Sequence, residues 1–188
     1  MSKRGLPVVI SAASGAGKST IINEILKVRS DLVFSISFTS REPRRGEAEG
    51  VDYHFVTCQE FEQYIKENRF VEWEIVHGNY YGTDREALEC ILKVGKHIIL
   101  DLDVNGGQRL RAVYPETILI FLYPPSLEEL QQRLSKRGTE TEESVLYRLA
   151  RYPLEIEKGN KYPYRVINDS IELTTTAILR IINTNSKL

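Results

Sequence analysis

The stretch Pro7-Val-Val-Ile-Ser-Ala-Ala-Ser-Gly-Ala-Gly-Lys-Ser-Thr20 passes from an apolar run through a glycine-rich turn into a helical pattern. Residues 7–11 are typical of a short buried strand, because most of them are apolar. Residues 18–28 predict a helix whose apolar face is formed by Ile21, Ile22, Ile25 and Leu26. A strand, a glycine-rich loop and a helix in this order are the structural context of a phosphate-binding loop.

The turn ends in Gly17-Lys18-Ser19, as the phosphate-loop motif G-x-x-x-x-G-K-[ST] requires. Backbone N–H groups of such a loop close around phosphate oxygens, and the helix N-terminus adds partial positive charge. We expect Lys18 to contact the β- and γ-phosphates of ATP and Ser19 to bind Mg²⁺. Alanine replaces the first glycine of the motif, so we expect Ala12 to have a negative φ or to be strained. The structural alternative is a glycine-rich helix start that binds nothing.

A second polar segment, Ser37–Glu47 followed by Gly50–Tyr53, holds arginines beside hydroxyl groups and a tyrosine. Arg41 and Arg44 have the chemistry to clamp one dianionic phosphate from two sides, because each guanidinium offers a planar fork of donors. The alternative is a solvated loop in which these arginines pair with nearby glutamates. Composition alone favours that alternative.

Strand and helix patterns alternate along the chain, which predicts an α/β fold with a mostly parallel sheet flanked by helices. Beyond the first unit, the expected strands cover residues 34–38, 71–75, 97–104, 117–123 and 165–168. Helices are expected to carry residues 61–65 and 88–92, to begin at residue 126 and to cover residues 171–182. A turn is expected over Gly78–Gly82.

Two polar residues in the middle of the chain have open alternatives. In the half-buried strand at 71–75 the apolar residues alternate with Glu72 and Glu74, so Glu72 is either an outward strand residue or a ligand contact. Thr83 opens a capping-box spacing. It is either a plain helix cap or a cap whose hydroxyl proton stays free for a ligand.

The second half of the chain contains two further features of functional interest. Residues 97–104 are nearly all apolar but carry Asp101 and Asp103 near their C-terminal end, on one pleat face, where the tip of a parallel strand meets ligand. Residues 133–151 turn polar around Gly138, between two helical stretches. This pattern predicts a mobile helical lid.

Composition excludes several classes of protein. The 188 residues include 25 Lys and Arg against 26 Asp and Glu, so a net charge of −1 provides no global field for nucleic acid or an anionic membrane. Only two cysteines occur, Cys58 and Cys90, too few for a disulfide framework or a four-ligand zinc site. No apolar run approaches a membrane span, and we expect a cytoplasmic location without a signal peptide.

Taken together, these motifs resemble the bacterial guanylate kinases, nucleoside-monophosphate kinases that form GDP and ADP from GMP and ATP. The resemblance runs from about Pro7 to Asp169. Beyond the phosphate loop it is carried by Ser37–Glu47, Gly50–Tyr53, Phe70–Gly82, Leu100–Asp103 and Arg137–Ser144. It implies a P-loop NTPase fold with a small mixed β subdomain for the nucleoside monophosphate and a helical lid.

The resemblance also implies roles for single residues. The residues expected to bind ATP are Ala13, Ser14, Gly15, Ala16, Gly17, Lys18, Ser19, Thr20, Arg133, Arg137 and Asn168. Those expected to bind GMP are Ser37, Arg41, Arg44, Tyr53, Glu72, Tyr81, Thr83, Asp101 and Asp103. The residues expected to act on the transferring phosphoryl group are Lys18, Arg44, Arg137 and Arg148, and those expected to hold Mg²⁺ are Ser19 and Asp101.

The chemistry of guanine supports the role of Glu72. Guanine presents N1–H and its 2-amino group side by side, so one carboxylate accepts from both, whereas the unprotonated N1 of adenine repels it. A hydroxyl at Ser37 or Thr83 suits O6. In a dry pocket the unpaired polar groups disfavour AMP by up to roughly 10⁴–10⁵.

We therefore expect one guanylate-kinase-like domain over residues 1–188. Its core is expected at 1–36, 85–125 and 156–188, its GMP-binding subdomain at 37–84 and its lid at 126–155. The expected partners are ATP with Mg²⁺ and GMP, with dGMP as a further candidate acceptor and without nucleic acid or membrane. Monomer and homo-oligomer both stay open.

Two rival interpretations remain. The first is a non-catalytic guanylate-kinase-like module that binds peptides, against which the retained Gly17-Lys18-Ser19 ending argues. The second is a kinase that phosphorylates a different acceptor, against which Glu72 and Ser37 argue.

Overall fold

The computed structural model of the chain describes residues 4–76, 78–136 and 142–186. Its central sheet has five parallel strands in the order β2-β7-β1-β8-β9. The strands are β1 (Pro7–Ala12), β2 (Leu32–Phe34), β7 (His97–Leu100), β8 (Ile118–Tyr123) and β9 (Tyr164–Ile167). The predicted α/β class is confirmed. Because the strands are parallel, their carboxyl ends share one edge of the sheet, where α/β proteins bind ligands.

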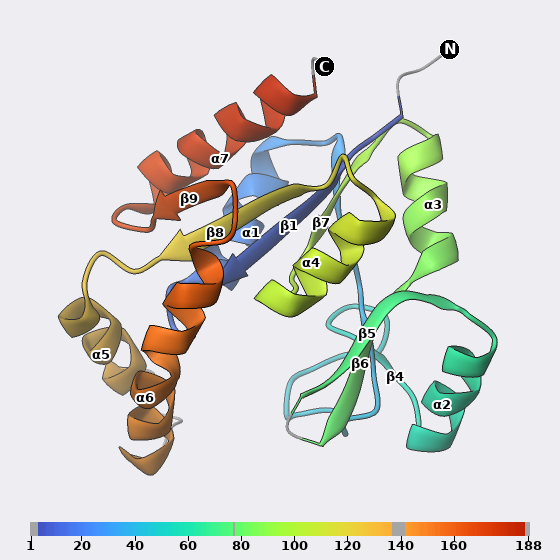
Figure 1. Cartoon of the computed structure of the whole chain (residues 1–188), viewed down its shortest axis with the longest axis horizontal. Coiled ribbons are helices and arrows are strands. Elements are labelled where there is room, and N and C mark those ends of the chain that lie inside the picture. The colour runs from blue at the N-terminus through green and yellow to red at the C-terminus, as the bar shows by residue number, and fades with distance from the viewer. Residues whose placement is uncertain (1–3, 77, 137–141, 187–188) are drawn as a thin grey trace.

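Helices cover both faces of this sheet (Figure 1). They are α1 (Lys18–Val28) and α7 (Ile171–Asn185) on one face and α3 (Arg85–Lys93) and α4 (Val104–Val113) on the other. Residues of β1 alternate between the two cores, because Val8 and Ile10 pack on the α1 side and Val9 on the α4 side. Strands buried on both faces are apolar throughout, which is why their pattern is visible in the sequence.

A second, smaller sheet lies beside the core and is mixed, with the order β4-β3-β6-β5. Its strands are β3 (Phe38–Thr39), β4 (His54–Phe55), β5 (Phe70–Val76) and β6 (Asn79–Asp84). Helix α2 (Cys58–Lys66) begins with a capping box and packs on this sheet through Phe61, whose ring stacks on Phe70 with centroids 4.4 Å apart. The aromatic cluster gives this unit a core of its own.

Two further helices, α5 (Leu127–Lys136) and α6 (Glu142–Gly159), project from the core beside the carboxyl edge of the sheet (Figure 1). The Ser126 hydroxyl accepts a hydrogen bond from the N–H of Glu129, so the predicted helix start at residue 126 is confirmed. The predicted residues Arg137 and Gly138 lie outside the described residues. Within the described ranges, every helix falls short of the length and apolarity that a bilayer crossing needs.

The strand predicted at 34–38 is divided in the structure. Its first residues end β2 in the central sheet, and its last residue begins β3 in the smaller sheet. Ser35 still donates to the carbonyl of Ile99, after which the chain leaves the central sheet. A single alternating pattern therefore serves two sheets, and the prediction of one continuous strand is wrong because periodicity does not register a change of partner.

Two predictions near residue 80 are also wrong. The turn expected over Gly78–Gly82 is largely strand, since β6 starts at Asn79 and pairs with β5. Thr83 belongs to β6 and does not cap α3. Asp84 takes that place and accepts a hydrogen bond from the N–H of Ala87.

The strand predicted at 97–104 is shorter than expected. β7 ends at Leu100, and α4 begins at Val104, a helix absent from the predicted elements. Asp103 is its N-cap and accepts a hydrogen bond from the N–H of Gly106 at 2.6 Å. The two aspartates therefore lie in the connection beyond the strand, at its ligand-facing end, and not on a pleat face.

Candidate active site

The phosphate loop connects the carboxyl end of β1 to α1. Gly17 has φ of 89°, a conformation that favours glycine, and an added Cβ would lie 2.6 Å from the amide nitrogen of Asn168. That amide donates to the Ala16 carbonyl at 2.6 Å, so Asn168 holds the loop from behind. Ala12 ends β1 and, within the described residues, only Asn68 combines a side chain with positive φ. The expected alternative of strain at Ala12 is therefore wrong.

The start of α1 has the features of an anion-binding helix N-terminus. Its N-cap, Gly17, makes no side-chain capping bond, and the first turn holds no acidic residue. The N–H groups of this turn thus point toward the ligand edge with the positive end of the helix dipole. Lys18 lies beside them and forms an ion pair with Asp101, while Ser19 and Thr20 are exposed.

Helix α6 reaches across to the phosphate loop. The Arg148 guanidinium donates to the Ser14 hydroxyl at 2.8 Å, and the Ser14 N–H donates to the Glu155 carboxylate at 2.9 Å. Arg133 of α5 lies nearby and donates to the backbone carbonyl of Asn168 at 3.2 Å. One carboxylate oxygen of Glu155 therefore contacts a loop N–H of the kind that binds phosphate.

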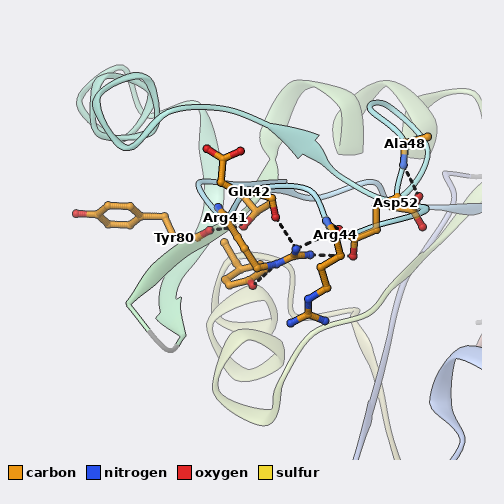
Figure 2. A network of polar contacts seen from close by, with 9 residues as sticks. Arg41, Glu42, Arg44, Ala48, Asp52 and Tyr80 are labelled. Carbon is orange, nitrogen blue, oxygen red and sulfur yellow. Dashed lines mark hydrogen bonds and ion pairs between the residues drawn. The ribbon is translucent and has the colours of Figure 1, made fainter. Parts of the chain in front are cut away.

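In the polar segment after β3, Arg41 is the centre of a hydrogen-bond network (Figure 2). It donates to both carboxylate oxygens of Glu47, at 2.9 and 3.0 Å, and to the Tyr81 hydroxyl at 3.2 Å. These bonds, to Glu47 first, raise the pKa of the Arg41 guanidinium and lower the pKa of the Glu47 carboxyl. The ion-pair alternative proposed for this loop is thus present for Arg41.

Arg44 and Tyr53 complete this group. The backbone N–H of Arg44 donates to Glu47 at 2.7 Å, whereas its guanidinium points away from the dashed contacts of Figure 2. The Tyr53 ring lies 5.5 Å from the Arg41 guanidinium carbon. Burial raises the pKa of the Tyr53 phenol, which keeps it protonated as a donor at neutral pH.

A cleft of about 220 Å³ lies between the smaller sheet and the carboxyl edge of the central sheet. Its lining includes many residues predicted to bind GMP, namely Ser37, Tyr53, Glu72, Tyr81, Asp101 and Asp103. The structure therefore brings together residues that span positions 37 to 103 of the sequence. Glu74 and Gly106 also line this cleft and were missed by the sequence analysis.

Glu72 is buried in this cleft, with only 6% of its surface exposed. Its Oε1 accepts a hydrogen bond from the Thr83 hydroxyl at 2.7 Å. Burial raises the pKa of the Glu72 carboxyl, an effect that the bond from Thr83 and the charge of Arg109 oppose. The interpretation of Glu72 as an outward strand residue is wrong, because it is Trp73 and Ile75, 40% and 57% exposed, that face away.

The register shift between Phe70 and Glu72 helps to explain this reversal, since it lets consecutive residues of β5 be buried before regular alternation resumes. Glu74 then shares the cleft face with Glu72, as residues two apart on a strand do. That spacing was the available signal for Glu74. No sequence signal pointed to Arg109 of α4, which donates to Glu74 at 2.8 Å.

A second cleft adjoins the first and shares Glu74, Val76 and Asp103 with it. Its other lining residues are Ser14, Ile75, Asn105, Arg148, Arg151, Glu155 and Lys158. It connects the phosphate loop and α6 with the Glu72 cleft. A phosphate held by the loop and a ligand held beside Glu72 would therefore meet between them.

Comparison with known proteins places this architecture in a family. The family model described as guanylate kinase matches residues 4–185, nearly the whole chain. The chain belongs to the guanylate kinase family. This membership confirms the resemblance inferred from the motifs.

Individual members of the guanylate kinase family show the extent of the similarity. The chain is 45% identical over 171 residues to the guanylate kinase of Clostridium perfringens strain SM101, covering 91% of this chain and 79% of the relative. It is 44% identical to that of Clostridium tetani, covering 96% and 86%. The crystal structure of guanylate kinase from Anaplasma phagocytophilum superimposes with a TM-score of 0.80 at 31% identity, covering 99% of this chain and 88% of that one.

The residues of this guanylate kinase family member fit a Mg²⁺ ion that arrives with nucleotide. Within residues 4–76, 78–136 and 142–186, no group of three or more His, Cys, Asp or Glu side chains is arranged to hold a metal by itself. Mg²⁺ in kinases is bound by one or two side chains together with substrate phosphates. The exposed Ser19 hydroxyl and the Asp101 carboxylate beside Lys18 offer that donor set.

Proposed function

We propose that this member of the guanylate kinase family transfers the γ-phosphoryl group of Mg²⁺-bound ATP to GMP, giving ADP and GDP. The observation that carries the proposal is the continuity of the two clefts. One is lined by Ser14 of the phosphate loop and by residues of α6, the other is lined by the buried Glu72, and they share Glu74 and Asp103. A donor and an acceptor bound there would be aligned for direct transfer.

Glu72 is proposed to recognise the guanine base. Its Oε1 already accepts from Thr83, and a carboxylate has further lone pairs for the N1–H and 2-amino donors. Ser37 of the same cleft is proposed to donate to O6. Burial strengthens this discrimination, because a base without those donors would leave Glu72 dry and unpaired.

The acceptor phosphate is proposed to bind between Arg41, Arg44, Tyr53 and Tyr81. Arg41 and Tyr81 are hydrogen-bonded to each other, and the Tyr53 ring lies against the Arg41 guanidinium. Glu47 now holds the Arg41 fork with two parallel bonds, the geometry that a phosphate would also use. Phosphate binding therefore replaces or adds to that pair, and the exposed Arg44 side chain closes on it.

Transfer needs no general base, because the attacking phosphate oxygen of GMP is already anionic. That oxygen bonds to Pγ, the bond from Pγ to the β–γ bridging oxygen breaks, and ADP leaves. Lys18, Arg148 and, from the resemblance, Arg137 and Arg44 are proposed to neutralise charge as it spreads over the transferring group. When bound with ATP at Ser19 and Asp101, Mg²⁺ supplies further charge neutralisation.

We propose that three parts of the chain have the separate roles that their motifs indicate. Residues 1–36, 85–125 and 156–188 form the core, residues 37–84 bind GMP, and residues 126–155 form a lid. The contact from Arg148 to Ser14 supports a lid that meets the phosphate loop. Free thiols at Cys58 and Cys90 are compatible with the reducing cytoplasm that we propose as its location.

The test is release of ADP from MgATP with GMP, dGMP, AMP, UMP or no acceptor, run beside a Lys18→Ala variant. We expect rapid release of ADP with GMP and background rates with AMP and UMP. The rate with dGMP relative to GMP measures how much the ribose 2′-hydroxyl contributes. Equal rates with several acceptors would overturn the role of Glu72. Binding of GMP without turnover by any acceptor would favour the non-catalytic module.

A further inference from the structure

We infer that Arg109 is a positioning residue for guanine recognition: from α4 it fixes the Glu72 carboxylate and keeps it an acceptor. This inference rests on the proposed function, because it assigns the base contact to Glu72. Arg109 is not among the residues that line the Glu72 cleft, so its action on the base is indirect.

The geometry joins three charged groups from two elements. The Nη2 of Arg109 lies 2.8 Å from Oε2 of Glu74 and 3.6 Å from Oε2 of Glu72. The other Glu72 oxygen, Oε1, accepts from Thr83. One oxygen of the Glu72 carboxylate therefore accepts a hydrogen bond from a hydroxyl, and the other faces a cation at ion-pair distance, which orients the carboxylate before a base arrives.

Helix α4 can approach Glu72 this closely because of Gly106. A Cβ at that position would lie 3.1 Å from Oε2 of Glu72 and 3.3 Å from Oδ1 of Asp103. Arg109 is three residues further on and so lies on the same face of the helix, one turn away. The absence of a side chain at Gly106 leaves room for Oε2 of Glu72, and the Arg109 guanidinium lies near the same oxygen.

The charges around Glu72 explain why a cation is needed. The cleft is lined by Glu72, Glu74, Asp101 and Asp103, and its described lining contains no lysine or arginine. The groups that face Glu72 are Thr83 from β6, Glu74 from its own strand, and Asp103 and Arg109 from the start of α4 and its interior. Like charges favour protonation of a carboxylate, and so does burial.

Protonation would remove the function of Glu72. A neutral carboxyl presents an O–H donor, whereas guanine offers two donors of its own and needs acceptors. Arg109 is the cation that opposes burial and the neighbouring carboxylates, and it holds the pKa of Glu72 lower than it would otherwise be. The Arg109 side chain is 41% exposed, so solvent screens part of its charge. Its effect on the pKa of Glu72 acts mainly on the buried carboxylate oxygen Oε2.

The test compares Arg109→Met and Arg109→Lys with Arg111→Met, which removes a charge from an exposed position of the same helix. KM for GMP, KM for ATP and kcat are measured from pH 5 to pH 9. We expect Arg109→Met to raise KM for GMP about tenfold at pH 7, in keeping with a coupling of about 1.4 kcal/mol. The values of kcat and of KM for ATP stay within about twofold of the unaltered chain, and Arg109→Lys recovers part of the loss.

The pH profile separates positioning from a merely structural role. Loss of the cation raises the pKa of Glu72, so kcat/KM for GMP falls off at a higher pH than in the unaltered chain. Glu74→Gln removes a negative charge beside Glu72 and leaves Glu72 as the anionic partner of Arg109. Both changes lower the pKa of Glu72, so the acid limb of kcat/KM for GMP moves to lower pH. If Arg109→Met fails to fold, Arg109→Gln takes its place, and an acid limb that stays at the pH of the unaltered chain would overturn the inference.

An unchanged KM for GMP in Arg109→Met, or an equal rise at every pH, would overturn the inference. Calorimetric titration of each variant with GMP over the same pH range distinguishes this result from failure of the proposed function. If the unaltered chain binds GMP but does not phosphorylate it, the proposed kinase is wrong while the pH shifts in binding still test Arg109.

Discussion

The phosphate loop and the Glu72 cleft adjoin each other but are assembled in different ways. The loop is one continuous segment between β1 and α1, and its conformation is supported by a rigid parallel sheet. The cleft takes Glu72 from β5, Tyr81 from β6 and Gly106 from α4. Its recognition chemistry therefore exists only when two sheets and a helix meet.

This difference indicates how each region should respond to change. A loop whose ligands are backbone N–H groups depends little on any one side chain except Lys18, which carries the charge. A cleft built from side chains of separate elements depends on pairs such as Glu72 with Thr83. Single substitutions should therefore affect rate in the first region and acceptor choice in the second.

The largest effect is expected from Lys18→Ala. It should lower kcat by about 10²–10³, because an electrostatic contact to the transferring phosphoryl group is lost. Binding of GMP should be retained, since Lys18 is not among the residues that line the Glu72 cleft. Lys27→Ala on the same helix, whose exposed ammonium pairs with Glu24, is the control and should leave kcat unchanged. A Lys18 variant with more than a tenth of the original kcat would contradict the comparison.

Glu72→Gln should lower kcat/KM for GMP by about 10²-fold and reduce the preference for GMP over AMP. The charged acceptor is lost, and a hydrogen bond to an ionised group is worth about 1.5–3 kcal/mol. Steady-state kinetics with both acceptors measure the change. Glu67→Gln, an exposed change at the end of α2, serves as control. If Glu72→Gln lowers kcat and leaves selectivity intact, recognition lies elsewhere.

A smaller and opposite effect is expected from Glu155→Ala. The Glu155 carboxylate contacts the Ser14 N–H and competes with a nucleotide phosphate for it. Its removal should lower KM for ATP about two- to tenfold, as expected for a hydrogen bond of about 0.5–1.5 kcal/mol. Glu157→Ala, exposed on the same helix, is the matched control. A higher KM for ATP in Glu155→Ala would mean that the carboxylate supports the loop.

The smallest effect is expected from Ala12→Gly, which restores the first glycine of the motif. Ala12 already has an unstrained conformation at the end of β1, so kcat and KM for ATP should not change. Unfolding stability should fall by about 0.5–1 kcal/mol, because glycine in a strand loses more chain entropy. Chemical denaturation and kinetics on the same preparation check both. A marked gain in kcat would show that alanine does impair the loop.

The sequence predicted much of the central sheet but less of the smaller one. β1 and β8 were found because strands buried on both faces are apolar runs, and α1 and α7 because their aliphatic residues recur at helical spacing. In β5 the same rule misassigned the faces. Trp73 and Ile75 are exposed there, while Glu72 is buried in the cleft, where it accepts a hydrogen bond from Thr83. Hydrophobic periodicity cannot identify a polar residue that is buried through a hydrogen bond to another strand.

The sequence by itself determined the phosphate loop, because strand, glycines and Lys18 are contiguous and their geometry is local. It also indicated Glu72, Thr83 and Asp103 through resemblance and through the chemistry of guanine. Only the tertiary structure decided that Thr83 donates to Glu72, and that Arg109 lies within ion-pair distance of both Glu72 and Glu74. Those contacts join residues from different elements, and their distances depend on how a second sheet packs against α4, which no local pattern encodes.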